Sequence, residues 1–393
     1  MAQPIRVGIS HSFQTRGRQA LAARERTIRM RADYLVTGGA GFIGCALATE
    51  LIGRPGEDGE VRIAAVDSLH PQVHPSRSRP DALPAPVALH VMDVCDAEAW
   101  NRVLENQRPA NVVHLAAETG TGQSLDLPTR HTHVNVTGSA QMLEAFDRAG
   151  YRPEHMLLAS SRAVYGEGRW VDPQSGDVFT PGHRPIEQLE RGEFNVFAPS
   201  GAAARPLPHN QAEMFGNPVS VYGATKLAQE QIIKLWCLAR DVPLTILRFQ
   251  NVYGAGQSPH NPYTGIVGLF HRMAAAGRPI EVYEDGMIGR DFIYIDDIAR
   301  CIAAALDRCP KTLRVLDVGS GDATTILEIA RAIAGLYGAP SPVISGAYRY
   351  GDIRWAVAAM APVKSELGFE ARVSLEEGNQ LLSAWLRDLG ELG

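Results

Sequence analysis

The stretch Tyr34-Leu-Val-Thr-Gly-Gly-Ala-Gly-Phe-Ile-Gly44 decides the fold, because an apolar segment runs into a glycine turn and then into an amphipathic run. Gly38, Gly41 and Gly44 stand three residues apart, and Gly39 completes a G-x-G-x-x-G pattern. Such glycines permit a tight turn, close approach of the backbone to a pyrophosphate, and close packing of helix on strand. The first N–H groups of the helix would face the phosphates. The sequence therefore predicts a dinucleotide-binding strand, turn and helix.

A second apolar run, 62–66, ends in Asp67, which lies 23 residues after Gly44. An acid at this strand end accepts hydrogen bonds from the ribose hydroxyls of an adenosine and repels a 2′-phosphate. Ser68, Leu69 and His70 follow, so no adjacent arginine or lysine could receive such a phosphate. We therefore expect NAD and not NADP, with a merely solvated acid as the alternative.

Composition places the chain among ordinary globular proteins. It has 393 residues, of which 45% are hydrophobic and 21% charged, and a formal net charge of −5, which argues against nucleic-acid binding. Five scattered cysteines without a C-x-x-C pair fit the reduced thiols of a cytosol and predict neither disulfides nor a metal site. No apolar run approaches membrane-spanning length. We expect a cytoplasmic protein that binds no nucleic acid and no membrane.

The chain divides into an arm and two parts of a globular fold. Residues 1–29 form an arginine-rich arm, predicted to be a disordered extension, with a transit peptide as the alternative. Beyond it, apolar runs alternate with helical patterns, which is the signature of an α/β fold with a doubly wound parallel sheet, a Rossmann fold. We expect the dinucleotide-binding domain at 30–250, with an insertion at 166–215. Residues 251–393 should form mainly a smaller C-terminal substrate-binding lobe, with parts that return to the sheet. The predicted strands are 62–66, 87–92, 111–115, 155–159, 244–249, 280–283 and 315–318, and the predicted helices include 97–106, 134–149 and 220–239.

The segment Tyr222-Gly-Ala-Thr-Lys226 carries the predicted chemistry. Tyrosine and lysine four residues apart lie on the same face of a helix. A phenol has a pKa of about 10, and a nearby ammonium with the positive nicotinamide ring would lower it toward neutrality. Tyr222 could then remove a proton from a sugar hydroxyl while the carbon gives a hydride to NAD⁺. Ser161, at the end of an earlier strand, would hydrogen-bond the same oxygen.

From Tyr34 to about Leu386 the sequence resembles the extended short-chain dehydrogenase/reductase family of nucleotide-sugar epimerases and dehydratases. The catalytic residues implied by the resemblance are Ser161, four residues before Tyr165, and the pair Tyr222 and Lys226. The pair would also contact the cofactor. The remaining cofactor-binding residues implied are Gly38, Gly41, Phe42, Ile43 and Gly44 in the turn, Asp67 and Ser68, then Asp93 and Val94 at the adenine, and Leu115, Ala116 and Ala117 along the cofactor.

Three later motifs imply the substrate site. Asn251 lies in a segment that resembles the family's diphosphate-binding segment. Arg290 and Arg349 match arginines that grip phosphates, and Asp352 matches an acid that meets the nucleotide ribose. Guanidinium groups suit this task because they pair phosphate oxygens bidentately. A surface ion pair is the alternative for either arginine.

Arg162 and Ala163 narrow the choice among the reactions of the family. They stand where its 4,6-dehydratases carry Asp-Glu. Without that acid and base, water elimination lacks its proton transfers. The closer resemblance is to dTDP-L-rhamnose 4-epimerase-like members. The segments that carry it are 67–74, 121–124, 164–168, 261–265 and 348–354. It implies an NAD-dependent 4-epimerase that acts through a transient 4-keto intermediate on a dTDP-6-deoxyhexose such as dTDP-L-rhamnose.

Several points stay open at this level. A UDP-sugar or UDP-uronic acid 4-epimerase, a C4 reductase or dehydrogenase, and a non-catalytic subunit are the alternatives. Relatives often carry a cysteine knuckle in the insertion, but 194–208 holds no cysteine, so no metal is expected.

The family resemblance also implies a homodimer through the helices at 134–149 and 222–239. Strand alternation turns Arg162 away from the sugar, whereas a kink at the strand end would bring it back.

Overall fold

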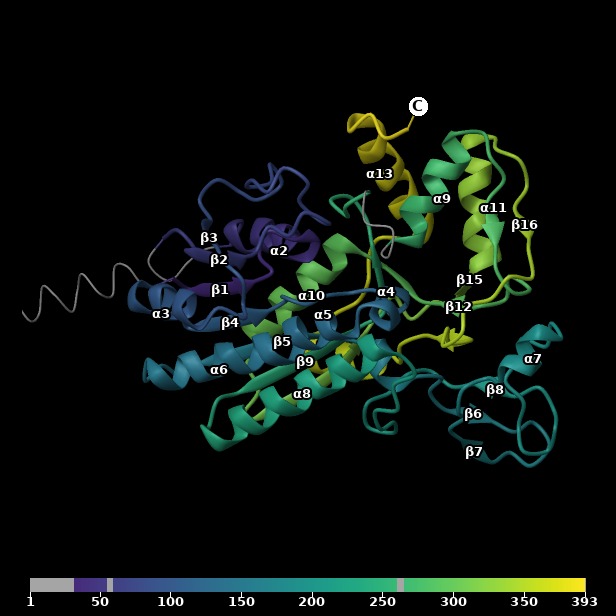
Figure 1. Ribbon diagram of the computed structural model, residues 1–393, viewed down its shortest axis with the longest axis horizontal. Helices are drawn as coiled ribbons and strands as arrows, with labels where there is room; N and C mark the ends of the chain where they lie inside the picture. The colour runs from purple at the N-terminus through teal and green to yellow at the C-terminus, as the bar shows by residue number, and fades with distance from the viewer. Residues whose placement is uncertain (1–31, 55–58, 260–264, 393) are drawn as a thin grey trace, which may run out of the picture.

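The computed structural model describes residues 32–54, 59–259 and 265–392. Its centre is a seven-stranded parallel sheet in the order β14-β9-β5-β4-β1-β2-β3 (Figure 1). The predicted doubly wound α/β fold is confirmed. The seven strands are β1 (Tyr34–Thr37), β2 (Ile63–Asp67), β3 (Ala88–Val91), β4 (Asn111–His114), β5 (His155–Ser161), β9 (Leu244–Phe249) and β14 (Leu313–Val318).

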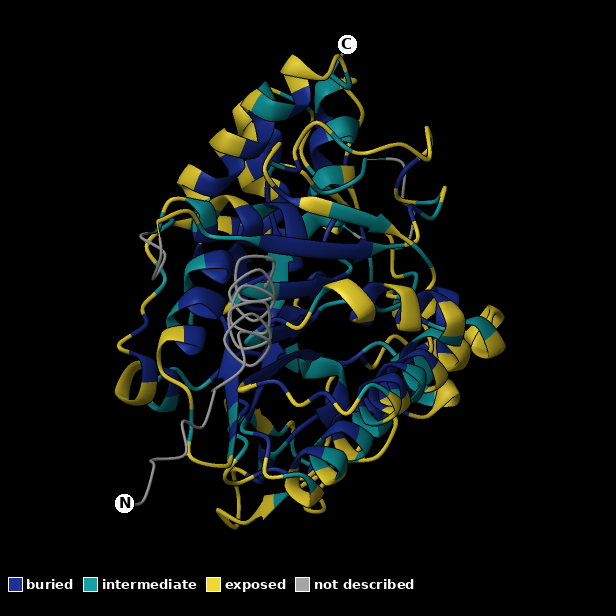
Figure 2. Ribbon diagram, turned by 90° about the vertical axis from the view of Figure 1, so that its left-hand side faces the viewer, coloured by how far each residue is buried: buried dark blue, intermediate teal, exposed yellow. Residues whose placement is uncertain are grey.

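Helices cover both faces of this sheet, because neighbouring strand residues point to opposite sides. Leu35 packs into the core beneath α3 (Ala97–Asn106), α6 (Gly138–Arg148) and α8 (Val221–Ala239). Val36 packs into the opposite core, beneath α2 (Phe42–Ile52), α10 (Ile295–Asp307) and α12 (Ala361–Leu367). Figure 2 shows the buried sheet between these partly exposed helices.

The strand order reverses at β1. Tyr34 pairs with Ile63 of β2 on one side and with Asn111 of β4 on the other. At such a switch point the loops beyond the carboxyl ends of the two strands diverge and leave a crevice for a ligand. The glycine turn follows β1 directly, so the fold places it at this crevice.

The segment before α6 differs from its predicted form. A single helix was expected over 134–149, but the structure has a π-helix, η1 (His133–Thr137), which continues into α6. Two short helices precede it, α4 (Thr121–Asp126) and α5 (Pro128–Thr132). A π-helix inserted in a helical segment often marks a functional site.

The C-terminal lobe has its own core around α9 (Ile266–Ala275), α11 (Ile326–Tyr337) and α13 (Leu375–Asp388). Three small sheets, separate from the main sheet, pair segments of the chain beyond β9 with one another: β10 with β13, β11 with β16, and β15-β12-β17. Their strands are β10 (Asn251–Tyr253), β11 (Glu281–Val282), β12 (Gly289–Arg290), β13 (Phe292–Tyr294), β15 (Thr324–Thr325), β16 (Val343–Ile344) and β17 (Trp355–Ala356).

The insertion forms a small antiparallel sheet in the order β7-β6-β8 with one short helix, near the lobe (Figure 1). Its elements are β6 (Trp170–Val171), β7 (Val178–Phe179), α7 (Ile186–Glu190) and β8 (Arg205–Pro206). A one-turn 3₁₀ helix, η2 (Arg162–Tyr165), leads into it from β5. Of the described helices, none combines the length and the apolar character needed to cross a membrane.

Candidate active site

The glycine turn leaves no room for side chains. Gly38 has a φ of 66°, and a Cβ on it would lie 2.9 Å from the backbone nitrogen of Ala116. A Cβ on Gly44 would lie 2.5 Å from the carbonyl oxygen of Gly38. Both positions therefore require glycine, the first also because of its backbone conformation.

Gly41 has a different role. It is the N-cap residue of α2, and no side chain caps that end of the helix. The first N–H groups of a helix have no partner within it, so those of Phe42 and Ile43 can be offered to a phosphate. This uncapped N-terminus beside the glycine turn fits the pyrophosphate of a dinucleotide.

Asp67 ends β2 beside this turn. Its carboxylate accepts hydrogen bonds from the backbone N–H of Ala40 at 3.1 Å and of Leu69 at 2.9 Å. These bonds orient the acid at the crevice, where an adenosine ribose would lie. Asp93 and Val94 follow the neighbouring strand β3, so they reach the same edge of the sheet. Ser68 is exposed.

Leu115, Ala116 and Ala117 follow β4, on the other side of the switch point. The backbone N–H of Leu115 donates to the carbonyl of Thr37 at 3.0 Å, and that of Ala116 donates to the Thr37 hydroxyl at 3.2 Å. This segment is thereby held along the end of β1. The predicted cofactor residues on both sides of the crevice thus come together.

Tyr222 lies in the first turn of α8, close to the end of β5. Gly223 allows this approach, since a Cβ on it would lie 2.4 Å from the carbonyl oxygen of Ala163. The Ser220 side chain caps the helix by accepting from Gly223 N–H at 3.1 Å. The Tyr222 N–H donates to the Ser124 hydroxyl at 3.0 Å. Helix α8 is therefore fixed with Tyr222 against the strand end.

Ser161, and not Ser160, faces this tyrosine. Ser160 is buried and donates to the carboxylate of Glu230 on the inner side of α8. Ser161 points the other way, as strand alternation requires, and its side chain interacts with that of Tyr222. Burial raises the pKa of Tyr222, while Ser161 and the Arg162 guanidinium act to lower it.

Lys226 shares the helix face but differs from its expected electrostatic role. The side chain is buried, its ammonium donates to Gln229 Oε1, and burial lowers its pKa to about 7. We expected its charge to lower the pKa of Tyr222. In this structure Ser161 and Arg162 have that effect.

A buried polar chain leads from Lys226 to the glycine turn. Gln229 Nε2 donates to the Ser139 hydroxyl at 2.8 Å and lies 3.0 Å from His114 Nε2. His114 Nδ1 in turn lies 2.7 Å from the Thr37 hydroxyl. Burial, and then Lys226, lower the pKa of His114 to about 3, so the imidazole is neutral.

The sequence analysis did not predict this buried polar chain, nor did it predict a role for Asn135 in η1. The Asn135 amide donates to Thr225 Oγ1 at 2.9 Å, beside Lys226, and to the carbonyl of Glu118 at 3.1 Å. Its carbonyl oxygen accepts from Glu118 N–H at 2.7 Å. Buried polar residues in otherwise apolar helices were the available signal, but their partners are distant in the sequence.

The substrate end joins Asn251, Arg290, Asp352 and Arg162. Arg290 is buried and pairs with Asp352 at 2.7 Å. Arg162 Nε donates to Asn251 Oδ1 at 2.8 Å. Arg162 therefore points into the site, because β5 ends at Ser161 and the 3₁₀ turn breaks the alternation of side chains. The kink at the strand end, which the sequence left as one of two alternatives for Arg162, is therefore present.

Arg349 lies apart from this group. Its guanidinium stacks over the Tyr283 ring, 5.2 Å from the centroid, and the residue is exposed. Its phosphate-binding role stays a prediction. Residues 261–264, part of one resembling segment, and the arm 1–29 lie outside the described residues.

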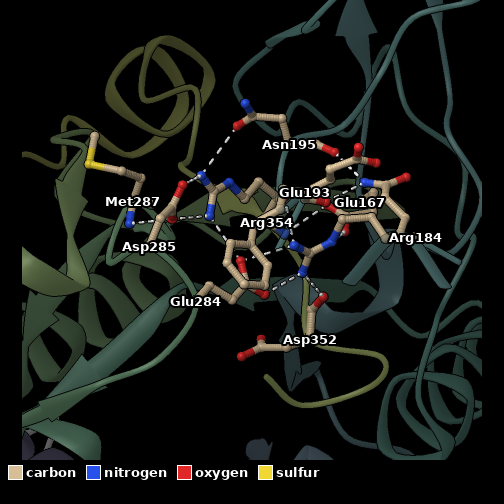
Figure 3. Close-up of polar contacts among 12 residues, drawn as sticks. Glu167, Arg184, Glu193, Asn195, Glu284, Asp285, Met287, Asp352 and Arg354 are labelled. Atoms are coloured by element: carbon tan, nitrogen blue, oxygen red, sulfur yellow. Dashed lines mark hydrogen bonds and ion pairs between the residues drawn. The ribbon is translucent and has the colours of Figure 1, made fainter. Parts of the chain in front are cut away.

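A buried ionic network joins the insertion to the substrate loop (Figure 3). Arg184 of the insertion is 4% exposed and donates to both carboxylate oxygens of Glu284, each at 2.9 Å. It also donates to the carbonyls of Phe194, at 2.8 Å, and of Asp352, at 2.7 Å. The insertion thus holds the backbone of a predicted substrate-binding residue.

Arg354 completes the network from the other side of Glu284 (Figure 3). It donates to Glu284 at 2.9 Å and to both oxygens of Asp285 at 2.7 Å. Its backbone N–H donates to buried Glu167 at 2.8 Å. Glu167 Oε1 also lies 3.4 Å from Arg184 Nε, yet burial outweighs this pairing and raises the pKa of Glu167 to about 7.

Comparisons with known proteins agree with this geometry. The model of the NAD dependent epimerase/dehydratase family matches residues 34–187 and 195–319. The chain belongs to this family. It is 47% identical over 352 residues to a dTDP-L-rhamnose 4-epimerase of Burkholderia thailandensis, covering 90% of this chain and 94% of that protein.

Solved structures of relatives have the same fold. The UDP-glucose 4-epimerase of Thermotoga maritima with UDP-glucose has a TM-score of 0.72 at 27% identity, covering 91% of this chain and 99% of that one. The Thermus thermophilus UDP-glucose 4-epimerase in complex with NAD has a TM-score of 0.71 at 26% identity, with the same coverage. The cofactor of this chain is NAD, which the turn and Asp67 fit. Within the described residues, no group of three His, Cys, Asp or Glu side chains could hold a metal ion.

Proposed function

We propose that this protein is an NAD-dependent nucleotide-sugar 4-epimerase that acts on a dTDP-6-deoxyhexose such as dTDP-L-rhamnose. The observation that carries the proposal is the meeting of Tyr222 and Ser161 at the carboxyl edge of the sheet, beside the NAD crevice. The 47% identity to a dTDP-L-rhamnose 4-epimerase over nearly the whole of both chains supports the choice of substrate.

The residues suggest how the reaction proceeds. Bound NAD would supply reversible hydride exchange at C4 of the sugar. Tyr222 would hold the proton of the 4-hydroxyl on its phenol oxygen, and Ser161 would hydrogen-bond and orient the same sugar oxygen. Lys226, which is held in place by its hydrogen bond to Gln229, would contact the cofactor. After the 4-keto sugar has rotated in the site, return of the hydride to the opposite face of C4 and of the proton from Tyr222 to the 4-oxygen would give the inverted alcohol.

The nucleotide would lie across the substrate end. We assign its diphosphate to Asn251, Arg290 and Arg349, and its ribose to Asp352. No carboxylate follows Ser161, where Arg162 and Ala163 stand, which speaks against dehydration. Asp67 disfavours a C4 reductase dependent on NADPH, because its charge repels a 2′-phosphate.

A UDP-uronic acid 4-epimerase is the second candidate, because the Arg162 guanidinium faces the site and could pair with a sugar carboxylate.

One experiment separates these two candidate functions. Purified protein is incubated with dTDP-L-rhamnose, UDP-glucose or UDP-glucuronic acid without added cofactor, and inversion at C4 is followed by NMR. Inversion of dTDP-L-rhamnose is expected. Turnover of UDP-glucuronic acid alone would replace the first candidate by the second, and a strict need for added NADPH would refute both.

We also propose a cytoplasmic homodimer. Leu235 and Leu238 of α8 are 62% and 49% exposed, which supports pairing through the helix layer of α6 and α8. Light scattering after gel filtration should give twice the mass of the chain. Leu235→Glu combined with Leu238→Glu should give the monomer mass, and a monomeric parent chain would contradict the proposal.

A further inference from the structure

Arg162 carries a charge that acts on Tyr222 but that no described carboxylate neutralises by direct contact. Its Nε donates to Asn251 Oδ1 at 2.8 Å, and this bond does not use the two terminal nitrogens. The residue follows Ser161 and interacts electrostatically with Tyr222, Arg290 and Asp352. The guanidinium therefore lies near both the reacting tyrosine and the predicted phosphate-binding pair.

Its charge has no acidic partner. Among the described residues, no carboxylate forms an ion pair with Arg162, and neither Nη1 nor Nη2 makes a hydrogen bond. Arg290 differs, since its Nη1 donates to the Gly289 carbonyl at 2.9 Å and its Nη2 to Asp352 at 2.7 Å. Burial, and then Arg290, lower the pKa of Arg162 to about 9, so the side chain is still charged at neutral pH.

Two carboxylates interact electrostatically with Arg162, but Asp352 is paired with Arg290, and Asp291 accepts hydrogen bonds from Ser320, Gly321 and Ala358. Neither carboxylate therefore makes a contact ion pair with the Arg162 guanidinium. An unpaired charge with little exposure is costly unless a ligand neutralises it. In a 6-deoxyhexose nucleotide the sugar is neutral, so the diphosphate is the anion available. The open edge of a guanidinium pairs two phosphate oxygens bidentately.

We propose that Arg162 binds the substrate phosphate that is attached to the sugar, with its terminal nitrogens on two phosphate oxygens. The inference rests on the proposed function, because it takes a nucleoside-diphosphate sugar as the substrate. Asn251 acts as the residue that orients Arg162. Arg349, which stacks on Tyr283, is not required for this contact.

The experiment compares two ligands that differ by this phosphate. Binding of dTDP and of dTMP to the NAD-loaded protein is measured by calorimetry for wild type, Arg162→Met and Arg162→Lys. Arg191→Met is the matched control, because it removes the same charge from a side chain that is 60% exposed and outside the site. Circular dichroism and bound NAD verify that each variant is folded.

Arg162→Met should weaken dTDP binding about ten- to a hundredfold, the usual effect of losing a charged hydrogen bond, and dTMP binding less than about twofold. Arg162→Lys should restore part of the loss, and Arg191→Met should change neither affinity. Equal losses for both ligands, or none, would overturn the proposal. A wild-type protein that binds neither dTDP nor UDP would refute the proposed function itself.

Discussion

Replacing Arg184 by methionine should destabilise the protein through the network that joins the insertion to the substrate loop. Methionine keeps much of the apolar stem but removes four hydrogen bonds: two to Glu284 and one each to the carbonyls of Phe194 and Asp352. Removing one partner of a buried ion pair costs about 3–5 kcal/mol, because the other charge is left uncompensated. Glu284 keeps Arg354, so we expect a loss near the lower end, about 3 kcal/mol.

Chemical denaturation followed by circular dichroism measures this loss, which is a large part of a typical stability of about 5–15 kcal/mol. Hydrogen exchange then shows which segments are destabilised. Amides of the insertion and of the loop at 349–354 should exchange faster in Arg184→Met than in the wild type. Arg191→Met is the control, since Arg191 pairs with Glu193 on the surface of the same insertion. If Arg184→Met and Arg191→Met had the same midpoint and the same exchange, the network would not join the insertion to the lobe.

Three further changes test the site. Tyr222→Phe should leave the fold and NAD content unchanged but lower kcat about 10²–10⁴-fold, as expected for a positioned acid–base group, and near-normal turnover would place the base elsewhere. Asp67→Ala should weaken NAD binding by about 1–3 kcal/mol and reduce discrimination against NADP in titrations, whereas unchanged NAD affinity would exclude the ribose contact. The pKa of Glu167 is raised to about 7 in the folded chain, so between about pH 4.5 and 7 the folded chain holds a proton that the unfolded chain has lost. Its contribution to stability is therefore present at low pH and is lost as the pH rises through this range. Glu167→Gln should remove this slope from the pH dependence of the unfolding midpoint, and parallel curves for the two proteins would count against the raised pKa.

The sequence by itself determined the parts of this protein that depend on local chemistry. The glycine turn after β1 could be recognised because glycine alone tolerates its backbone conformation and close contacts. Apolar runs of strand length that alternate with helical periods predicted the doubly wound sheet. The spacing of Tyr222 and Lys226 placed both on one helix face. The resemblance to the family pointed to Ser161, four residues before Tyr165, and not to Ser160.

The tertiary structure decided which side chains meet across long separations in the sequence. Arg184 and Glu284 are 100 residues apart, and Gln229 and His114 are 115 residues apart, so no local period relates them. The direction of Arg162 depended on where β5 ends and the 3₁₀ turn begins, because a shift of one residue exchanges the faces of a strand. The partners of Lys226 and the position of Arg349 over Tyr283 likewise follow from packing. Local propensity predicts elements, whereas the contacts of buried charges depend on the complete fold.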